Sequence, residues 1–365
     1  INKKLIFVKN ILRLGVTQIL YMNVPDYSSV NTSVNIIKKK NPLYSKLVNA
    51  LLRRVCRAKK EDLIKSNPIL NIPKWLIKGW IKSYGVTTSK KIAHSLTSQP
   101  MIDINIKKDQ FMQKNWEKIF KGRNIFKNII RIEKAGDITK LPFFDEGFWW
   151  VQSVSASIPV EIINDFYEKK VIKEKKVLEI GSAPGGKTIQ LLDNDFNVTG
   201  LEISKKRIKI LQKNLSRLNL QTRIINNDIL KWKNKEFFDC VLLDSPCSAT
   251  GLIKKKPEIL INKTKANIKN LIKKQKSIAQ KVSEIISING LLIYVVCSIE
   301  FEEGQNQITN FLKKNKNYKI IKINEKIFDG LEFINNNGMI SITPNCNASL
   351  GGMDGFFIAC LQRTY

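Results

Sequence analysis

From about residue 171 the chain alternates short apolar runs with helical patterns, and this alternation constrains the fold more than any other feature. The runs are predicted as strands at 176–180, 198–201, 223–225 and 240–243, with helices over 187–192 and 205–218 between them. Alternation of this kind is typical of an α/β protein with a parallel, doubly wound, Rossmann-like sheet. Sheets of this type bind their ligands at the carboxyl ends of the strands.

Two cysteines follow strands of this predicted sheet. Cys247 comes shortly after the run 240–243, and Cys297 comes shortly after the run 291–294. Because parallel strand ends meet at one edge of the sheet, the two thiols are expected to face one substrate. One thiol can attack while the other assists, which is what covalent methylation of a pyrimidine base requires. The alternative is that both are buried structural cysteines, but each is followed by further polar residues.

A glycine loop follows the first of these strands and opens a helix at Lys187. Acidic residues stand after the later strands, at Glu202, Asp228 and Asp244. An acid about twenty positions beyond such a loop binds ribose hydroxyls in nucleoside-cofactor sites. S-adenosylmethionine, which presents a ribose, an adenine and a cationic sulfonium, suits these neighbours. The predicted cofactor-binding residues are Gly181, Ser182, Ala183, Pro184, Gly185, Gly186, Lys187, Glu202, Asp228 and Asp244.

The same loop supports a competing interpretation. Residues 181–188 also fit the P-loop pattern G-x-x-x-x-G-K-[ST] of nucleoside triphosphatases (NTPases). The run 241–244 can pass for their second, Mg²⁺-holding acidic strand. Such an enzyme has no particular use for Glu202, which favours the nucleoside-cofactor site. An NTPase stays the alternative from another functional class.

The charge of the chain predicts a polyanionic partner. It has 62 Lys and Arg against 31 Asp and Glu, a formal net charge of +31. An excess this large favours nucleic acid, although a composition rich in Lys, Asn and Ile also permits drift on solvated faces. The six cysteines form no Cys-x-x-Cys pair, which argues against a disulfide framework or a metal site and suits the cytoplasm. Because His94 is the only histidine, a Ser-His-Asp triad is not expected. No apolar run is long enough for a membrane helix.

The first 145 residues are organised differently. Apolar residues recur at helical spacing through 1–60, which predicts a small helical bundle. Its end carries a basic cluster that is either a phosphate-binding face or a solvated helix end: Arg53, Arg54, Arg57, Lys59 and Lys60. A further helix is predicted over 74–96, followed by a small α+β segment over 101–145. In that segment we expect a strand over 102–106 and one helix over 111–120.

Three motifs resemble one family. Residues 183–188, residues 244–251 and the pair Cys297-Ser298 are similar to the NOL/NOP/Sun RNA cytosine-5 methyltransferases, in particular those acting on bacterial 16S ribosomal RNA. The resemblance implies a class I methyltransferase domain over 146–365. It also implies a NusB-like helical RNA-binding domain over 1–66, shortened at its N-terminus, and linker helices with a small α+β RNA-binding segment over 67–145.

The resemblance also implies roles for single residues. Cys297 attacks C6 of the base, Cys247 assists release, Asp244 contacts N3 of the base, and Lys187 holds the base or its phosphate. Lys254–Lys256 match a basic substrate loop. The expected partner is small-subunit ribosomal RNA, bound by a monomer.

The residues alone leave other assignments open. DNA cytosine-5 methyltransferases use a Pro-Cys nucleophile, which would point to Cys247 instead. The sequence also departs from the family pattern at Gly181, Glu202, Val296 and Gly304. A noncatalytic RNA-binding protein with a degraded methyltransferase domain is therefore a further alternative, although every reacting side chain is present.

Overall fold

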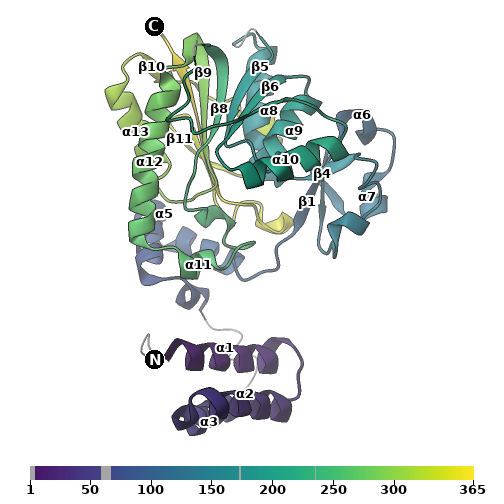
Figure 1. Cartoon of the computed structure of the whole chain (residues 1–365), viewed down its shortest axis with the longest axis vertical. Coiled ribbons are helices and arrows are strands. Elements are labelled where there is room, and N and C mark those ends of the chain that lie inside the picture. The colour runs from purple at the N-terminus through teal and green to yellow at the C-terminus, as the bar shows by residue number, and fades with distance from the viewer. Residues whose placement is uncertain (1–4, 59–66, 172–173, 235) are drawn as a thin grey trace. The chain divides into compact units, whose positions relative to one another are not determined.

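The computed structural model describes residues 5–58, 67–171, 174–234 and 236–365. The chain divides into two compact units, Ile1–Leu70 and Asn71–Tyr365, which Figure 1 shows in purple and in blue to yellow. No described helix is both long enough and apolar enough to cross a lipid bilayer.

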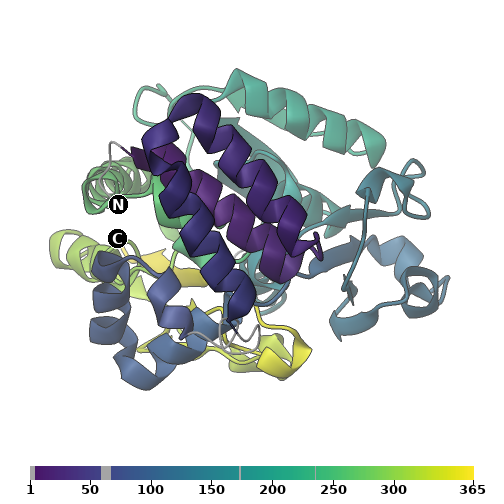
Figure 2. The same cartoon turned by 90° about the horizontal axis from the view of Figure 1, so that it is seen from below.

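The first unit is a helical bundle, as the periodicity predicts. Its helices are α1 (Ile6–Tyr21), α2 (Asp26–Lys40) and α3 (Ser45–Arg57), and Figure 2 shows them from below. No single helix can bury its apolar face alone, so the three share one core. That core contains Val8, Ile11, Ile19, Leu20, Val30, Ile37, Val48 and Leu52. Arg53, Arg54 and Arg57 are exposed on α3, whereas Lys59 and Lys60 lie outside the described residues.

The second unit opens with α5 (Lys74–Ser95), which is interrupted at Gly85, where φ is 78°. A small antiparallel sheet follows, in the order β2-β3-β1-β4. Its strands are β1 (Ile102–Ile106), β2 (Arg123–Phe126), β3 (Ile129–Ile132) and β4 (Trp149–Val151).

The single helix predicted over 111–120 is wrong. The chain forms two short helices there, α6 (Lys108–Phe111) and α7 (Trp116–Phe120). Asn115 caps the second one, since its side chain accepts a hydrogen bond from the Lys118 N–H at 3.0 Å. A side chain that satisfies a free N–H of the first turn begins a new helix at this point.

The main sheet has nine strands among the described residues, with the path β11-β12-β13-β9-β8-β5-β6-β7 and β10 paired to β13. The five central strands from β9 to β7 are parallel, as predicted, and β13 runs antiparallel to β9. Their bounds are β5 (Lys176–Ile180), β6 (Asn197–Glu202), β7 (Arg223–Asn226), β8 (Phe238–Asp244), β9 (Ile286–Val296), β10 (Tyr318–Ile320), β11 (Ile334–Asn336), β12 (Met339–Ile342) and β13 (Phe356–Arg363).

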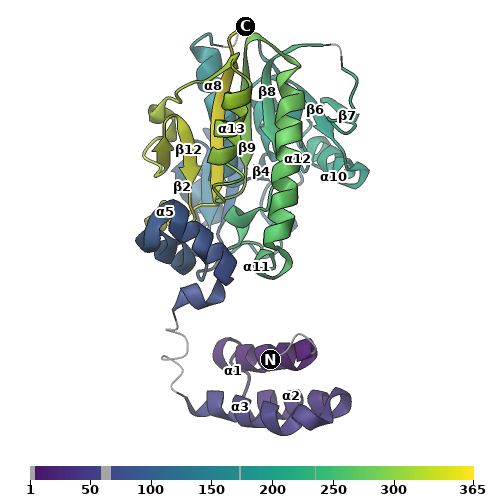
Figure 3. The same ribbon diagram turned by 90° about the vertical axis from the view of Figure 1, so that its left-hand side faces the viewer.

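Helices cover both faces of this sheet (Figure 3). Alternate residues of the central strands bury one face against α8 and α9 and the other against α12 and α13. Burial on both faces explains why these strands read as continuous apolar runs. The helices are α8 (Val154–Glu168), α9 (Gly186–Asp193), α10 (Lys205–Arg217), α11 (Ile259–Asn262), α12 (Lys265–Ser283) and α13 (Gln305–Lys314).

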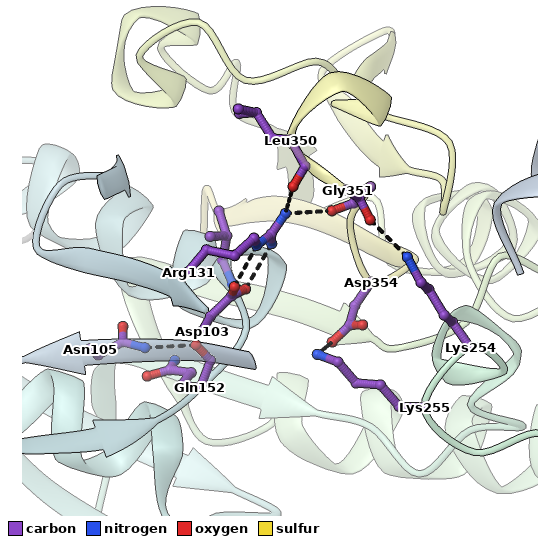
Figure 4. Close-up of polar contacts among 11 residues, drawn as sticks. Asp103, Asn105, Arg131, Gln152, Lys254, Lys255, Leu350, Gly351 and Asp354 are labelled. Carbon is purple, nitrogen blue, oxygen red and sulfur yellow. Dashed lines mark hydrogen bonds and ion pairs between the residues drawn. The ribbon is translucent and has the colours of Figure 1, made fainter. Parts of the chain in front are cut away.

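A buried ion pair ties the small sheet to the rest of the second unit (Figure 4). Arg131 of β3 holds Asp103 of β1 with two hydrogen bonds, Nε to Oδ1 at 2.6 Å and Nη2 to Oδ2 at 2.9 Å. Its Nη1 donates to the carbonyl oxygens of Leu350 and Gly352 at 2.8 and 2.7 Å. Asp103 also accepts from the Val154 N–H at the start of α8. This network fixes the small sheet against the loop that precedes β13.

Candidate active site

The predicted site residues meet at the carboxyl edge of the main sheet. Gly181 follows β5, Asp244 ends β8, and Cys297 follows β9. They border a cavity of about 380 Å³, a volume that suits a small ligand. The predicted residues that line it are Gly181, Glu202, Asp228, Asp244, Cys247 and Cys297.

The two cysteines are in contact in this cavity. Their sulfur atoms lie 3.4 Å apart, and both thiols are free and half-buried. The hydrogen bond to Cys297 is the largest cause that raises the pKa of Cys247 well above its ordinary value; burial and the charges of Cys297 and Glu303 add to it. The raised pKa favours the protonated form of Cys247, and either sulfur can be the donor in this contact.

Lys187 and Asp244 form an ion pair beside these thiols. Lys187 lies buried at the start of α9, and its Nζ is 2.7 Å from Asp244 Oδ2. Burial acts to lower the pKa of Lys187, but the charge and hydrogen bond of Asp244 outweigh it, so that pKa is raised. Lys187 thus stays charged, with its ammonium committed to a carboxylate. A P-loop lysine would instead be directed at phosphates.

Glu202 and Asp228 supply further carboxylates to the cavity. Glu202 Oε1 accepts from the Ser204 N–H at 2.9 Å, and Oε2 lies 3.2 Å from the guanidinium of Arg207. Asp228 accepts from the Leu230 N–H at 3.0 Å. Ile203 and Ile229 border the same cavity with apolar surface. Carboxylates that accept hydrogen bonds from hydroxyl and amino groups, next to apolar walls for a base, fit a nucleoside cofactor.

Lys187 and five predicted loop residues lie outside the lining of this cavity; the loop residues are Ser182, Ala183, Pro184, Gly185 and Gly186. Their backbone holds the loop against α10 instead. The carbonyl of Ala183 accepts from Arg207, and that of Pro184 accepts from Asn214 at 2.9 Å. Gly185 has a φ of 112°, and a Cβ there would come within 2.5 Å of Leu211, so only glycine fits. Contact between these five residues and a cofactor stays a prediction.

The basic loop after Cys247 is bound within the protein more than predicted. Lys254 Nζ donates to the Gly351 carbonyl at 2.7 Å, and Lys255 pairs with Asp354 at 2.8 Å (Figure 4). Only Lys256 of the three is exposed without a partner among the described contacts. Of these three lysines, we therefore expect only Lys256 to contact an RNA phosphate.

The carboxylate of Glu303 beside this cavity was not predicted from the sequence. Glu303 is fully buried, and its carboxylate contacts the loops that carry the two cysteines. It stands in an acidic stretch with Glu300 and Glu302, and no spacing rule indicates which of the three turns inward.

Two family models and several curated proteins match this chain. The family model described as "16S rRNA methyltransferase RsmB/F" matches residues 169–362, and the "NusB family" model matches residues 1–57. The "Ribosomal RNA small subunit methyltransferase B" of Photorhabdus laumondii is 27% identical over 97% of this chain and 81% of its own length.

Two solved structures share the fold. The crystal structure named "PH0851" superposes with a TM-score of 0.75 at 21% identity, over 98% of this chain and 82% of its own. That of NSun6 from Pyrococcus horikoshii with SFG gives 0.66 at 16% identity, over 81% of this chain and 100% of its own.

Proposed function

The chain belongs to the 16S rRNA methyltransferase RsmB/F family, and we propose that it methylates C5 of a cytosine in 16S ribosomal RNA through a covalent adduct at Cys297. The family membership makes it an S-adenosylmethionine-dependent rRNA methyltransferase with a NusB-like N-terminal region. The contact of two free thiols at 3.4 Å in the cavity carries the proposal for the cytosine and for the mechanism.

Attack by Cys297 makes the base reactive. C5 of cytosine is too weak a nucleophile to take a methyl group directly. The thiolate of Cys297 forms a bond to C6, and the electron pair of the C5–C6 bond moves into the ring as N3 gains a proton or hydrogen bond. We assign the Lys187–Asp244 pair to this step: the Lys187 ammonium supplies the proton, which passes through the Asp244 carboxylate to N3. The resulting enamine then attacks through C5.

The bound cofactor supplies one electrophilic methyl group, and carboxylates hold it. Glu202 is assigned to the ribose hydroxyls, because it follows β6 and borders the cavity. Asp228, which follows β7, is assigned to the adenine side together with Ile229. Because the ammonium of Lys187 is paired with Asp244, it is not directed at a phosphate, as the P-loop lysine of an NTPase would be.

Cys247 gains its role when the adduct has formed. Once Cys297 is a neutral thioether, it no longer exerts the effects that raise the pKa of Cys247 most. Cys247 can then release its proton to water in the open cavity, and the resulting thiolate accepts the C5 proton of the methylated ring. Loss of that proton restores the C5–C6 double bond and expels the sulfur of Cys297. This contact supports the proposed order, in which Cys297 attacks first and Cys247 acts second.

The RNA has to present its target outside a helix. A stacked and paired base cannot reach the thiols, so the cytosine must lie in a loop or be flipped out. We assign the surrounding phosphates to Lys256 and to the exposed arginines Arg53, Arg54 and Arg57. The site of action we propose is the cytoplasm.

The direct test is product identification. The protein is incubated with methyl-labelled S-adenosylmethionine and unmodified 16S ribosomal RNA, and the digested RNA is separated into nucleosides. We expect the label in 5-methylcytidine, and none with Cys297→Ala. Label in a different methylated nucleoside would refute the cytosine C5 assignment. A wild-type protein that binds RNA without transferring label would support the noncatalytic alternative.

A further inference from the structure

Glu303 occupies the position where the two cysteine-bearing loops meet. It follows Cys297 by a short turn and is fully buried. Its Oε1 accepts hydrogen bonds from the Ser248 N–H at 2.9 Å and from Gln275 Nε2 at 3.0 Å. Its Oε2 accepts from the Ser298 hydroxyl at 2.6 Å and also from the Ser248 hydroxyl.

These donors belong to both loops of the site. Ser248 directly follows Cys247, and Ser298 directly follows Cys297. The two serine hydroxyls are themselves 3.2 Å apart, and the Ser298 hydroxyl is 3.1 Å from that of Thr250. A buried carboxylate is stable only when its lone pairs are satisfied, so this geometry is strongly determined.

We propose that Glu303 is a positioning residue that holds the loop carrying Cys247 against the loop carrying Cys297 and so keeps the two sulfur atoms in contact. Each loop contributes one serine to the same carboxylate, one residue beyond its cysteine. A shift of either serine would move its neighbouring sulfur. The importance of this contact for methylation rests on the proposed function, but the contact itself does not.

The negative charge of Glu303 also acts on Cys247. It contributes to the raised pKa of Cys247, after the hydrogen bond to Cys297, burial and the charge of Cys297. A neutral residue at 303 would weaken both the alignment of the loops and the hold on the Cys247 proton.

The test measures the thiol contact without using methylation. A diazene oxidant such as diamide takes up two electrons and two protons from the two thiols, becomes a hydrazine, and leaves one disulfide. Peptide mapping by mass spectrometry follows formation of the Cys247–Cys297 disulfide in the full-length protein, with Cys297→Ser as the blank. We expect Glu303→Ala to form it more slowly by about tenfold or more, since small displacements of reacting groups have effects of this size.

A neighbouring carboxylate provides the matched control. Glu300 is also buried, but it accepts from Trp80 Nε1 at 2.8 Å instead of holding the serines of both loops. Glu300→Gln should therefore form the disulfide at about the wild-type rate. Ser298→Ala removes one donor and should slow it by a few fold, which keeps the test usable if Glu303→Ala does not fold.

Activity provides the second measurement. In Glu303→Gln we expect kcat for methyl transfer to fall while KM for S-adenosylmethionine stays within about twofold, because Glu303 does not line the cavity. Wild-type disulfide rates in folded Glu303→Ala or in Ser298→Ala would overturn the proposal. So would equal losses in Glu303→Ala and Glu300→Gln, which would indicate a general loss of stability. If Glu303→Ala forms the disulfide more slowly while the wild-type protein itself transfers no methyl group, the proposed function is refuted and the positioning role stands.

Discussion

Lys187 Nζ lies 2.7 Å from Asp244 Oδ2, so the helix after the glycine loop is joined to the end of β8 by a buried cation. This pair occupies the position where the sequence alone allows a phosphate-binding lysine. It also places a fixed positive charge beside the two thiols, since the charge of Cys297 contributes to the raised pKa of Lys187.

Two variants separate the contribution of this ion pair to stability from its contribution to catalysis. Lys187→Met leaves a carboxylate without its partner and should lower the free energy of unfolding by roughly 3 kcal/mol. Adding Asp244→Asn should recover part of that stability but no methyl transfer, because Asp244 is assigned to N3 of the base. Urea unfolding and single-turnover methylation measure the two effects separately. Recovery of activity in the double variant would show that the pair has only a structural role.

The Arg131–Asp103 pair should be a major source of stability in the second unit. Arg131→Met leaves Asp103 buried and frees two carbonyl oxygens in the loop before β13. We expect a loss of roughly 3–5 kcal/mol in the free energy of unfolding. Arg123→Met, on the exposed side of β2, is the control and should change it by less than about 0.5 kcal/mol. Equal losses in both variants would contradict the role of this network.

Burial of Glu179 should make stability depend on pH. Burial raises its pKa from 4.5 to about 8, against a hydrogen bond from Thr188 that lowers it. The folded state therefore holds a proton that the unfolded state releases near pH 4.5. The stability gained this way is present below that pH and is lost as the pH rises toward 8. Glu179→Gln should reduce the loss of stability between pH 5 and pH 8, measured by urea unfolding. Identical pH profiles for the variant and the wild type would contradict the shift.

The expected RNA-binding cations can be identified through the salt dependence of affinity. Removal of one cation that neutralises a phosphate should reduce the log–log slope of affinity against salt by about 0.7 on single-stranded RNA. Lys256→Gln and Arg54→Gln should each flatten the slope, whereas Lys319→Gln on β10 should leave it unchanged. A uniform response of all three variants would mean that the lysine excess is compositional and that no defined face binds the RNA.

The parts of the fold that sequence reasoning predicted are those with local causes. Strands buried on both faces are apolar throughout, so β5 was predicted with its observed bounds. The residues at the ends of two such runs, Asp244 and Cys297, border one cavity, as their positions predict. The helix over 111–120 failed because a single cap at Asn115 divides it.

Contacts between distant segments were not accessible to such reasoning. Lys254 reads as a free cation in the sequence, but the fold brings the Gly351 carbonyl within 2.7 Å of it. Nothing in the sequence distinguishes Glu303 from a surface acid. Its role follows from the pairing of β8 with β9, which places Ser248 and Ser298 next to its carboxylate.

The most direct test of the central claim is covalent trapping of RNA on the two cysteine variants. Cys247→Ala keeps the attacking thiol but cannot take the C5 proton, so it should accumulate as an adduct with 16S ribosomal RNA in the presence of S-adenosylmethionine. On a denaturing gel this adduct should appear as a band of retarded mobility. Cys297→Ala and the double variant should show no such band. A retarded band from Cys297→Ala, with none from Cys247→Ala, would contradict the account and make Cys247 the nucleophile.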